Sequence, residues 1–441
     1  MVKLFLSLII LLFLCSCSFD NKTGIWKNEN SLTKKSNDLF KDFELISSSN
    51  EIFNEIILYN KEYEIFLDPL INNKKWNDIF LNKNNNLNNF KLKNLNQEVF
   101  RSKKLTKHNL NNYTLFENNH LINSDEKGNL IIFSITTNEI IKFNFYKDKF
   151  KKIKKYLNFY VERNIIYVSD NLGYLYAYDY ILKKILWAKN YKIPFRSNLK
   201  VSKNDLIAAN QNNNLYFFNK KNGEILKNIP TEETPIKNSF VNNLSLSNNS
   251  LFFLNTYGSL YSLDLESKEI SWFINLNQSL ELNPGNLFLG NQIVNNNQKI
   301  VVSSSKNTHV IDIATGSIIY TKNFSSIIKP IISKNISFLI TRNDLLVAID
   351  LSSGEIIYSY DINEKISKFF KNKKKKVFFK EMMLVNNDIL VFLNNSYVLN
   401  FEKNGELKDV FTLPSKIYTS PIIIENSILY LTSRNKLSIL N

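Results

Sequence analysis

The feature that most constrains this chain is a turn that it repeats. DIATGSIIY (312–320) and DLSSGEIIY (350–358) share an Asp, a Gly four residues later and a Tyr eight residues later. The first residue of this pattern defines a column of anchors that runs through the chain: Ser134, Asp179, Asn219, Asp264, Asp312, Asp350, Phe401 and Asn441. Eight anchors at steps of roughly 40 to 50 residues match the period of a β-propeller built from blades of four strands.

Each anchor has a physical explanation. Upstream segments such as GYLYAYD and GSLYSLD alternate at period two, which is typical of strands. An Asp or Asn at the anchor can accept a backbone N–H two residues on and hold a turn. Glycine four residues later suits a left-handed backbone. We expect the large residues at the eighth position to wedge between neighbouring blades; they are Trp187, Trp272, Tyr320 and Tyr358.

The last anchor predicts how the ring closes. A blade that stops at Asn441 lacks its fourth strand, and the natural donor is a segment ahead of the first repeat, near residues 94–105. Such a strand would leave no open sheet edge at the junction. The sequence therefore predicts an all-β fold, an eight-bladed β-propeller of residues 94–441 closed by an N-terminal strand.

The N-terminus has the pattern of an export signal. Lys3 precedes an apolar run from Leu4 to Leu14, which is too short to span a bilayer. Leu14-Cys15-Ser16-Cys17 resembles the lipobox of bacterial lipoproteins, which implies a signal peptide of residues 1–16 and lipidation of Cys17. Ser18, in place of Asp, implies the outer membrane, facing the periplasm. Residues 17–93 are then expected to form an Asn/Lys-rich tether and docking segment, with Trp76 packed on the propeller.

Charge and composition narrow the function classes. The formal net charge is +16, which favours either anionic lipid or an acidic partner, or reflects lysine spread over a solvated surface. No nucleic-acid motif accompanies the charge. Three separated histidines, no Gly-rich phosphate loop and no cysteine pair after maturation give no catalytic or metal constellation. We therefore expect a protein that is not an enzyme and has no cofactor.

The repeats carry a resemblance to known families. GYLYAYDYILKKILW and GSLYSLDLESKEISW resemble the PQQ-like repeat, over about residues 94–441. Two families share this repeat: quinoprotein dehydrogenases, which bind pyrroloquinoline quinone and calcium at the axis, and the BamB lipoproteins of the outer-membrane β-barrel assembly machinery. The lipobox, the eight anchors and the lack of a cysteine pair favour the BamB family.

That resemblance implies a non-enzymatic scaffold. It would dock on the periplasmic domains of the barrel-forming subunit, beside companion lipoproteins, and assist insertion of unfolded outer-membrane proteins. Alternatives are a quinoprotein dehydrogenase, or a lipid-anchored propeller serving another envelope complex. The family's partner surface corresponds here to IPTEETPIKNS (229–239) and NQSLELNPGNLFLG (277–290). The alternative for each residue is an ordinary connecting loop. The candidate partner-binding residues are Thr234, Pro235, Ile236, Lys237, Leu280, Leu282, Asn283, Pro284 and Leu287.

Overall fold

The computed structural model describes residues 17–19, 26–28, 53–93, 97–233, 240–277, 288–371 and 376–441. The chain forms two units, Met1–Asn50 and Glu51–Asn441. In the first unit, β1 (Cys17–Phe19) pairs antiparallel with β2 (Trp26–Asn28). No helix in the described ranges combines the length and apolar character needed to cross a membrane.

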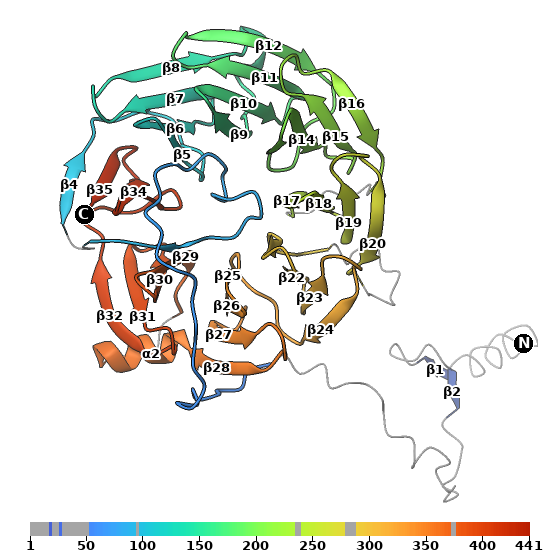
Figure 1. The fold of residues 1–441 in the computed structure, drawn as a ribbon, viewed down its shortest axis with the longest axis vertical. Helices are drawn as coiled ribbons and strands as arrows, with labels where there is room; N and C mark the ends of the chain where they lie inside the picture. The colour runs from blue at the N-terminus through green and yellow to red at the C-terminus, as the bar shows by residue number, and fades with distance from the viewer. Residues whose placement is uncertain are drawn as a thin grey trace, which may run out of the picture. The chain divides into compact units, whose positions relative to one another are not determined.

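The second unit is an eight-bladed β-propeller (Figure 1). In blades 1 to 7 the successive strands of the blade run outward from the axis, so the fourth strand lies on the rim; in blade 8 a strand from the N-terminal part of the chain takes that rim position. The first four blades are, in order, β5 (Leu115–Glu117), β6 (His120–Ser124), β7 (Asn129–Ser134) and β8 (Ile140–Asn144); β9 (Leu157–Glu162), β10 (Ile165–Asp170), β11 (Tyr174–Asp179) and β12 (Lys184–Asn190); β13 (Lys200–Ser202), β14 (Asp205–Ala209), β15 (Leu215–Asn219) and β16 (Ile225–Ile229); and β17 (Asn243–Ser247), β18 (Ser250–Leu254), β19 (Ser259–Asp264) and β20 (Ile270–Asn275).

The second half of the ring follows the same plan. Blades 5 to 8 are β21 (Val294–Asn295), β22 (Lys299–Ser303), β23 (Thr308–Asp312) and β24 (Ile318–Lys322); β25 (Ile331–Ser333), β26 (Ile336–Ile340), β27 (Leu345–Asp350) and β28 (Ile356–Asp361); β29 (Phe379–Val385), β30 (Asp388–Leu393), β31 (Tyr397–Phe401) and β32 (Leu407–Thr412); and β33 (Ile422–Ile424), β34 (Ser427–Leu431), β35 (Leu437–Leu440) and β4 (Glu98–Arg101). A short parallel strand, β3 (Asn89–Phe90), joins β29 as a fifth strand of blade 7.

The anchor is the last residue of the third strand in blades 1 to 7, and in blade 8 Asn441 directly follows the third strand. Asp350 shows why: its Oδ1 accepts the backbone N–H groups of Ser352 at 2.7 Å and Ser353 at 3.0 Å, which holds the turn. Gly354 follows with φ of +75°, in the left-handed region that favours glycine. The predicted eight blades and their turns are confirmed.

The predicted wedges are also confirmed. The indole of Trp187 lies against Gly223 of the next blade, where an added Cβ would meet the ring at 2.5 Å, and its Nε1–H donates to the Lys220 carbonyl at 3.1 Å. Trp272 repeats both contacts on Gly316 and Ile313. Tyr320 lies on Gly354 and Tyr358 on Gly405 in the same way. Each wedge joins the fourth strand of one blade to the turn of the following blade.

The ring closes through β4. This strand pairs antiparallel with β35, with Ser438 opposite Arg101 and Ile439 opposite Phe100. The Ser438 hydroxyl donates to the Glu98 carboxylate at 2.6 Å. The N-terminal strand predicted within residues 94–105 is thus confirmed at residues 98–101.

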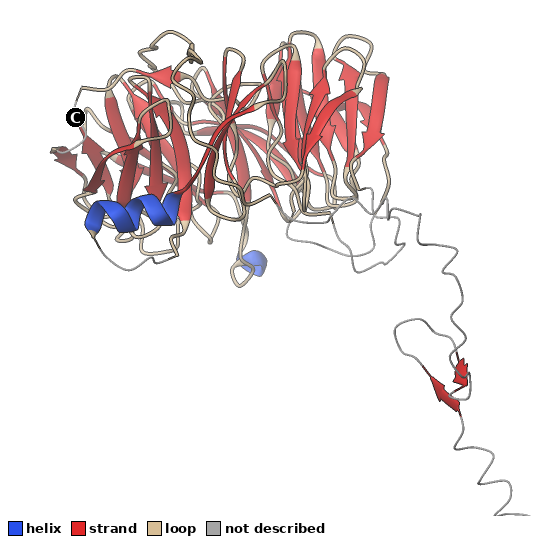
Figure 2. Ribbon diagram, turned by 90° about the horizontal axis from the view of Figure 1, so that it is seen from below, coloured by secondary structure: helices blue, strands red, loops and turns tan. Residues whose placement is uncertain are grey.

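The ring has two ends, which we name by their connections. The turn end carries the turns between first and second strands and between third and fourth strands. The loop end carries the turns between second and third strands and the connections from one blade to the next. Two of those connections hold the helices η1 (Asp148–Phe150) and α2 (Ile362–Phe370), which lie on the same side of the ring in Figure 2.

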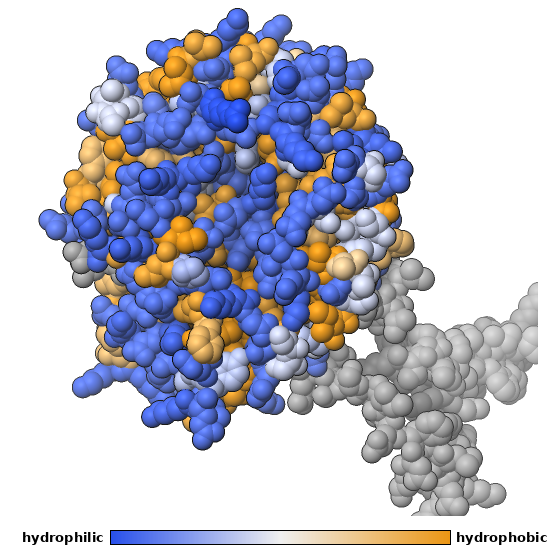
Figure 3. Space-filling view, viewed as in Figure 1, coloured by the Kyte–Doolittle hydropathy of each residue, from blue (hydrophilic) through white to orange (hydrophobic). Residues whose placement is uncertain are grey.

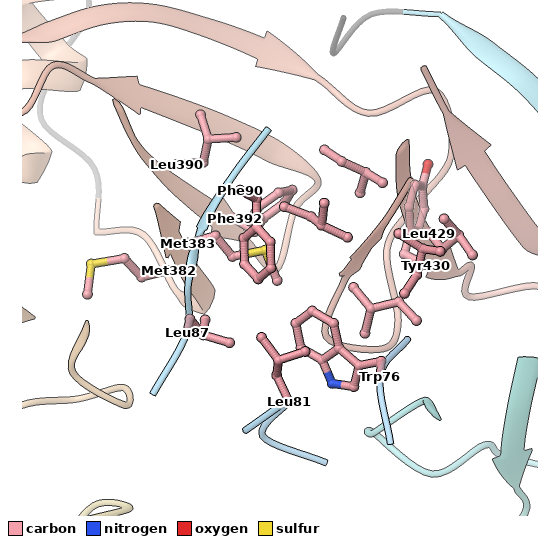
Figure 4. Close-up of a cluster of buried hydrophobic side chains, with 14 of the residues drawn as sticks. Trp76, Leu81, Leu87, Phe90, Met382, Met383, Leu390, Phe392, Leu429 and Tyr430 are labelled. Atoms are coloured by element: carbon pink, nitrogen blue, oxygen red, sulfur yellow. The ribbon is translucent and has the colours of Figure 1, made fainter. Parts of the chain in front are cut away.

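A segment that we call the strap, residues 53–93, covers the axis at the turn end (Figure 1). Its Ile57 pairs with Ser359 on the outer edge of β28, and its Tyr63 hydroxyl donates to the anchor Asp350 at 2.5 Å. Further on, Trp76 is buried and stacks on Phe90 at 5.9 Å between ring centroids. Figure 4 shows Trp76 and its neighbours in the strap against side chains of blades 7 and 8. The predicted packing of Trp76 on the propeller is confirmed.

Asparagines explain how the strap binds polar strand edges. The first strands of the blades face the axis; except in blade 7, where β3 pairs with β29, their inner edges have no strand partner among the described residues and need polar groups to bind. Asn85 Nδ2 donates to the carbonyls of Ile293 at 2.8 Å and Leu244 at 3.0 Å. Asn86 Nδ2 donates to the Ile332 carbonyl at 2.7 Å. The asparagine carboxamides of the strap therefore serve as partners for carbonyl groups of the inner strands in several blades.

Candidate docking site

The candidate partner-binding residues 234–237 and 280–287 lie outside the described residues. Their flanking segments are described, and these segments belong to two successive loop-end connections, from blade 3 to blade 4 and from blade 4 to blade 5. The described part of the candidate site therefore consists of the two bases of the loops.

Glu232 holds the base of the first loop. Its carboxylate accepts the Tyr261 hydroxyl at 2.6 Å, the Ser259 hydroxyl at 2.9 Å and Asn255 Nδ2 at 2.9 Å. Burial acts to raise the pKa of Glu232, but these hydrogen bonds outweigh it and lower the pKa. The base of the first loop is thereby tied, as a charged group, to the turn between the second and third strands of blade 4.

Phe288 holds the end of the second loop against the same turn. Its ring is buried and meets the buried ring of Phe240, at the end of the first loop, edge-on at 5.2 Å. A Cβ added to Gly258, whose φ is +97°, would lie 2.7 Å from the Phe288 ring. The bases of both candidate loops thus contact residues 255–261 of blade 4, and the structure brings the two bases together.

Apolar side chains are exposed around these bases. Val241 is 43% exposed, Tyr257 41% and Leu289 37%, and each is the direct neighbour of a base residue, Phe240, Gly258 or Phe288. We call the two loop bases and these three exposed side chains, which lie over blades 3 to 5, the docking platform. A rigid base with apolar and polar groups at its rim can bind a folded partner without rearranging.

The axis is the second place where chemistry is possible. Asp78 of the strap and Lys200 of β13 form a buried ion pair, with Lys200 Nζ 2.7 Å from Asp78 Oδ2. Lys200 Nζ also donates to the Asn82 carbonyl at 3.2 Å. Burial lowers the pKa of Lys200, and the carboxylate of Asp78 opposes that shift. A paired and hydrogen-bonded charge of this kind fixes the strap on the ring.

Two further buried ionisable groups, Lys329 and Glu381, line one small cavity. Lys329 Nζ donates to the Asn85 carbonyl at 2.9 Å, and burial lowers its pKa to about 8. Burial raises the pKa of Glu381. The cavity that they line with Trp76 and Tyr113 measures about 10 Å³, the space of a single water. The described residues at this place therefore do not fit a pyrroloquinoline quinone, and no group of three or more His, Cys, Asp or Glu among them could hold a metal.

Sequence reasoning missed these anchoring groups. Glu232 lies inside one of the two candidate loops, but nothing local distinguishes it from Glu233, since its partners come from residues 255–261. The Asp78–Lys200 pair joins residues 122 positions apart. Only a contact between distant segments, which a single sequence does not reveal, could have identified either.

Comparison with known proteins supports the fold. A family profile described as outer membrane protein assembly factor BamB matches residues 149–360. The structure of BamB from Moraxella catarrhalis aligns with a TM-score of 0.61 at 12% identity, over 78% of this chain and 99% of that one. Over residues 149–360 the chain is therefore similar to the BamB family of PQQ-like repeat proteins, and its fold is similar to that of a BamB propeller. The resemblance to BamB predicted from the repeats is thereby confirmed.

Other solved propellers share the architecture. The computationally designed Ika8 protein aligns with a TM-score of 0.59 at 11% identity, over 78% of this chain and 99% of its own. The quinohemoprotein alcohol dehydrogenase from Comamonas testosteroni aligns with a TM-score of 0.58 at 10% identity, over 83% of this chain and 80% of its own. At such identities these alignments establish the fold and leave function to the site. A search of curated protein sequences finds no match.

Proposed function

We propose that this BamB-like chain is a non-enzymatic scaffold of the outer-membrane β-barrel assembly machinery. It docks through the platform on the periplasmic domains of the barrel-forming subunit, next to companion lipoproteins, and assists insertion of outer-membrane proteins. The observation that carries this proposal is the shared base of the two loops. Glu232 and Phe288 tie the described bases of both loops to one turn of blade 4, so that the two bases lie together.

The same proposal includes anchoring and location. The lipobox-like segment ending in Cys17 supports diacylation of its sulfur and attachment to the outer membrane, facing the periplasm. The packing at the axis supports a scaffold rather than a quinoprotein. The strap and the buried Lys200 and Lys329 lie at the axis, which is where the resemblance to quinoproteins would place the cofactor.

The docking platform can be tested with substitutions matched in chemistry. The double variant Tyr257→Glu/Leu289→Glu introduces two charges on the platform, and Ile236→Glu/Leu282→Glu places two in the loops. Ile181→Glu/Leu182→Glu is the control, since both residues are exposed at the turn end. We expect the first two variants to lose co-purification of the barrel-forming subunit, while their circular dichroism and melting temperature stay at wild-type values.

Docking on this platform would be refuted if the control and the platform variants retained the subunit equally. The lipid anchor is tested separately by Cys17→Ser, for which we expect release of the protein from the membrane fraction. Retention of that variant in the membrane fraction, with the assembly subunit absent, would contradict lipidation at this residue.

A further inference from the structure

The loop end of the ring is chemically divided. Blades 3 to 5 carry the docking platform, whose described bases contain Glu232 and Glu233. Four connections lead from blade 6 through blades 7, 8 and 1 to blade 2; three of them are instead rich in lysine, and the one from blade 7 to blade 8 holds a single lysine. The four connections are residues 362–378, 413–421, 102–114 and 145–156, of which all but 372–375 belong to the described residues.

The connection from blade 1 to blade 2 is the most basic. Between residues 147 and 154 five exposed lysines accompany one acidic residue, Asp148. Apolar side chains are interleaved with them: Ile153 is exposed, and Tyr156 is 58% exposed. Lys149 Nζ lies over the ring of Phe150 at 4.9 Å, and Lys154 Nζ over Tyr156 at 5.4 Å. This pattern of cations and exposed rings is that of a segment lying at a lipid–water interface.

The connection from blade 6 to blade 7 has the same composition. Helix α2 buries Ile362 against the ring and ends in the exposed pair Phe369 and Phe370. Phe378 beyond it is 66% exposed, and Lys368, Lys371 and Lys376 are exposed beside these rings. Exposed aromatic side chains on a monomer mark an interaction surface when they gather in this way.

The intervening connections continue the charge. Lys103, Lys104 and Lys107 are exposed between blades 8 and 1, and Lys416 is exposed between blades 7 and 8. Three lysines of the described connections are offset by ion pairs: Lys154 with Glu126 at 3.6 Å, Lys365 with Glu406 at 2.5 Å and Lys368 with Glu364 at 2.6 Å. The lysines belong to several separate connections rather than to one patch, which suits a fluid surface of headgroups better than one protein with fixed carboxylates.

We propose that this basic arc, the loop end of blades 6, 7, 8, 1 and 2, rests on an anionic phospholipid surface. Its lysines contact headgroup phosphates, while Tyr156, Phe369, Phe370 and Phe378 enter the interfacial layer. The ring then stands with its loop end toward the membrane, so that the docking platform and the lipid contact share one side of the molecule. This inference needs neither the assembly partner nor the acyl chain.

The first test measures partition onto vesicles. The full chain carrying Cys17→Ser is used, so that no acyl chain at residue 17 can hold it. Vesicles contain phosphatidylglycerol and phosphatidylcholine, or phosphatidylcholine alone. We expect binding only to the anionic vesicles, and a loss on the order of 100-fold for Lys149→Ala/Lys151→Ala/Lys152→Ala, since each such lysine contributes about 1 kcal/mol at an anionic surface. The control Lys203→Ala/Lys221→Ala/Lys227→Ala removes the same charge from blade 3.

The second test asks which rings enter the lipid. Phe378→Trp and Tyr156→Trp are compared with Phe273→Trp, an equally exposed position on the rim strand β20. Brominated lipids in the anionic vesicles should quench the added tryptophan at 378 and 156 but not at 273. Equal losses for the two lysine triples, quenching at 273 alone, or binding to an acidic protein without binding to vesicles would each overturn the proposal. Circular dichroism of every variant checks that the ring is folded.

Discussion

The two ends of the ring differ in how much they repeat. At the turn end the left-handed residue four positions after the anchor recurs in blades 1 to 7, and at four blade junctions an aromatic wedge lies on it: Trp187, Trp272, Tyr320 and Tyr358 lie on Gly223, Gly316, Gly354 and Gly405. At the loop end the described parts of the blade-to-blade connections differ from one another: one holds η1, another α2, and others form the docking platform. The repeated end therefore determines how the blades pack, which leaves the other end free to vary in sequence and to carry binding surfaces.

The turn end is itself not uniform. Where the eighth residue after the anchor is aromatic, the next blade has glycine at its left-handed position. Lys227 occupies the eighth position in blade 3, and the facing left-handed residue of blade 4 is Lys268, with φ of +58°. The aromatic residue and the glycine thus occur as a pair, because a flat ring can approach only a residue without a side chain. At the surface, Figure 3 shows the turn end as largely hydrophilic, with apolar groups in small patches.

The largest expected effect concerns that pair. We expect Gly316→Ala to lower the free energy of unfolding by about 2–4 kcal/mol, because it combines a left-handed residue with a ring of Trp272 only 2.5 Å from the new Cβ. Gly354→Ala is the matched case, since its φ is almost the same but the Tyr320 ring lies 3.1 Å away. It should cost about 1–2 kcal/mol. Urea denaturation of both variants checks this; equal losses would mean that backbone strain alone matters.

The two ends should also lose stability in different pH ranges. At the turn end, backbone N–H donors hold the pKa of Asp264 and Asp312 below the usual range, so their stabilisation is present above the unfolded pKa and is lost only in strong acid. Below the loop-end turn at residues 304–307, His309 is buried between Thr321 and Ser304, and burial lowers its pKa to about 4. Its unfolded form binds a proton below pH 6.5, whereas the folded form resists protonation until about pH 4.

The stability linked to His309 should therefore decline as the pH falls from 6.5 towards 4, by on the order of 3 kcal/mol. His309→Gln keeps a polar side chain but cannot titrate, so its free energy of unfolding should stay nearly level over that range. Chemical denaturation at half-unit steps of pH measures both proteins. Parallel curves for the two proteins would show that the loop end does not contribute to acid sensitivity in this window.

The smallest effect is expected where the wedge is missing. Lys227→Trp with Lys268→Gly recreates the aromatic–glycine pair between blades 3 and 4, at the loss of the Lys268–Asp205 ion pair of 3.0 Å. We expect the double variant to be more stable than the sum of its single changes by about 1 kcal/mol, a coupling that a double-mutant cycle resolves. Additive changes would mean that ring and glycine do not act as a pair.

The sequence predicted the repeated part of the molecule well, since each anchor depends on residues within nine positions. Blade 1 is the exception in detail: its third and fourth strands pair without the register shift seen in blades 2 to 7, and Phe143 stacks on Tyr178 at 4.1 Å instead of a wedge on glycine. The strap was expected to dock, but its path depends on contacts such as that of Asn86 with Ile332, 246 residues apart. The docking bases escaped prediction for the same reason, since Glu232 and Phe288 have ordinary sequence surroundings.

Closure of the ring by β4 has a kinetic consequence. The strand that seals blade 8 is made early, whereas its partner β35 is made some 340 residues later. Seven junctions between blades can form as the chain emerges, yet the ring remains an open arc with two bare edges until β35 is available. Such a long-range contact makes the final step slow and leaves the arc vulnerable to pairing with other chains in the meantime. A holding chaperone would be most needed in that interval, and cutting the chain within β35 should trap the arc.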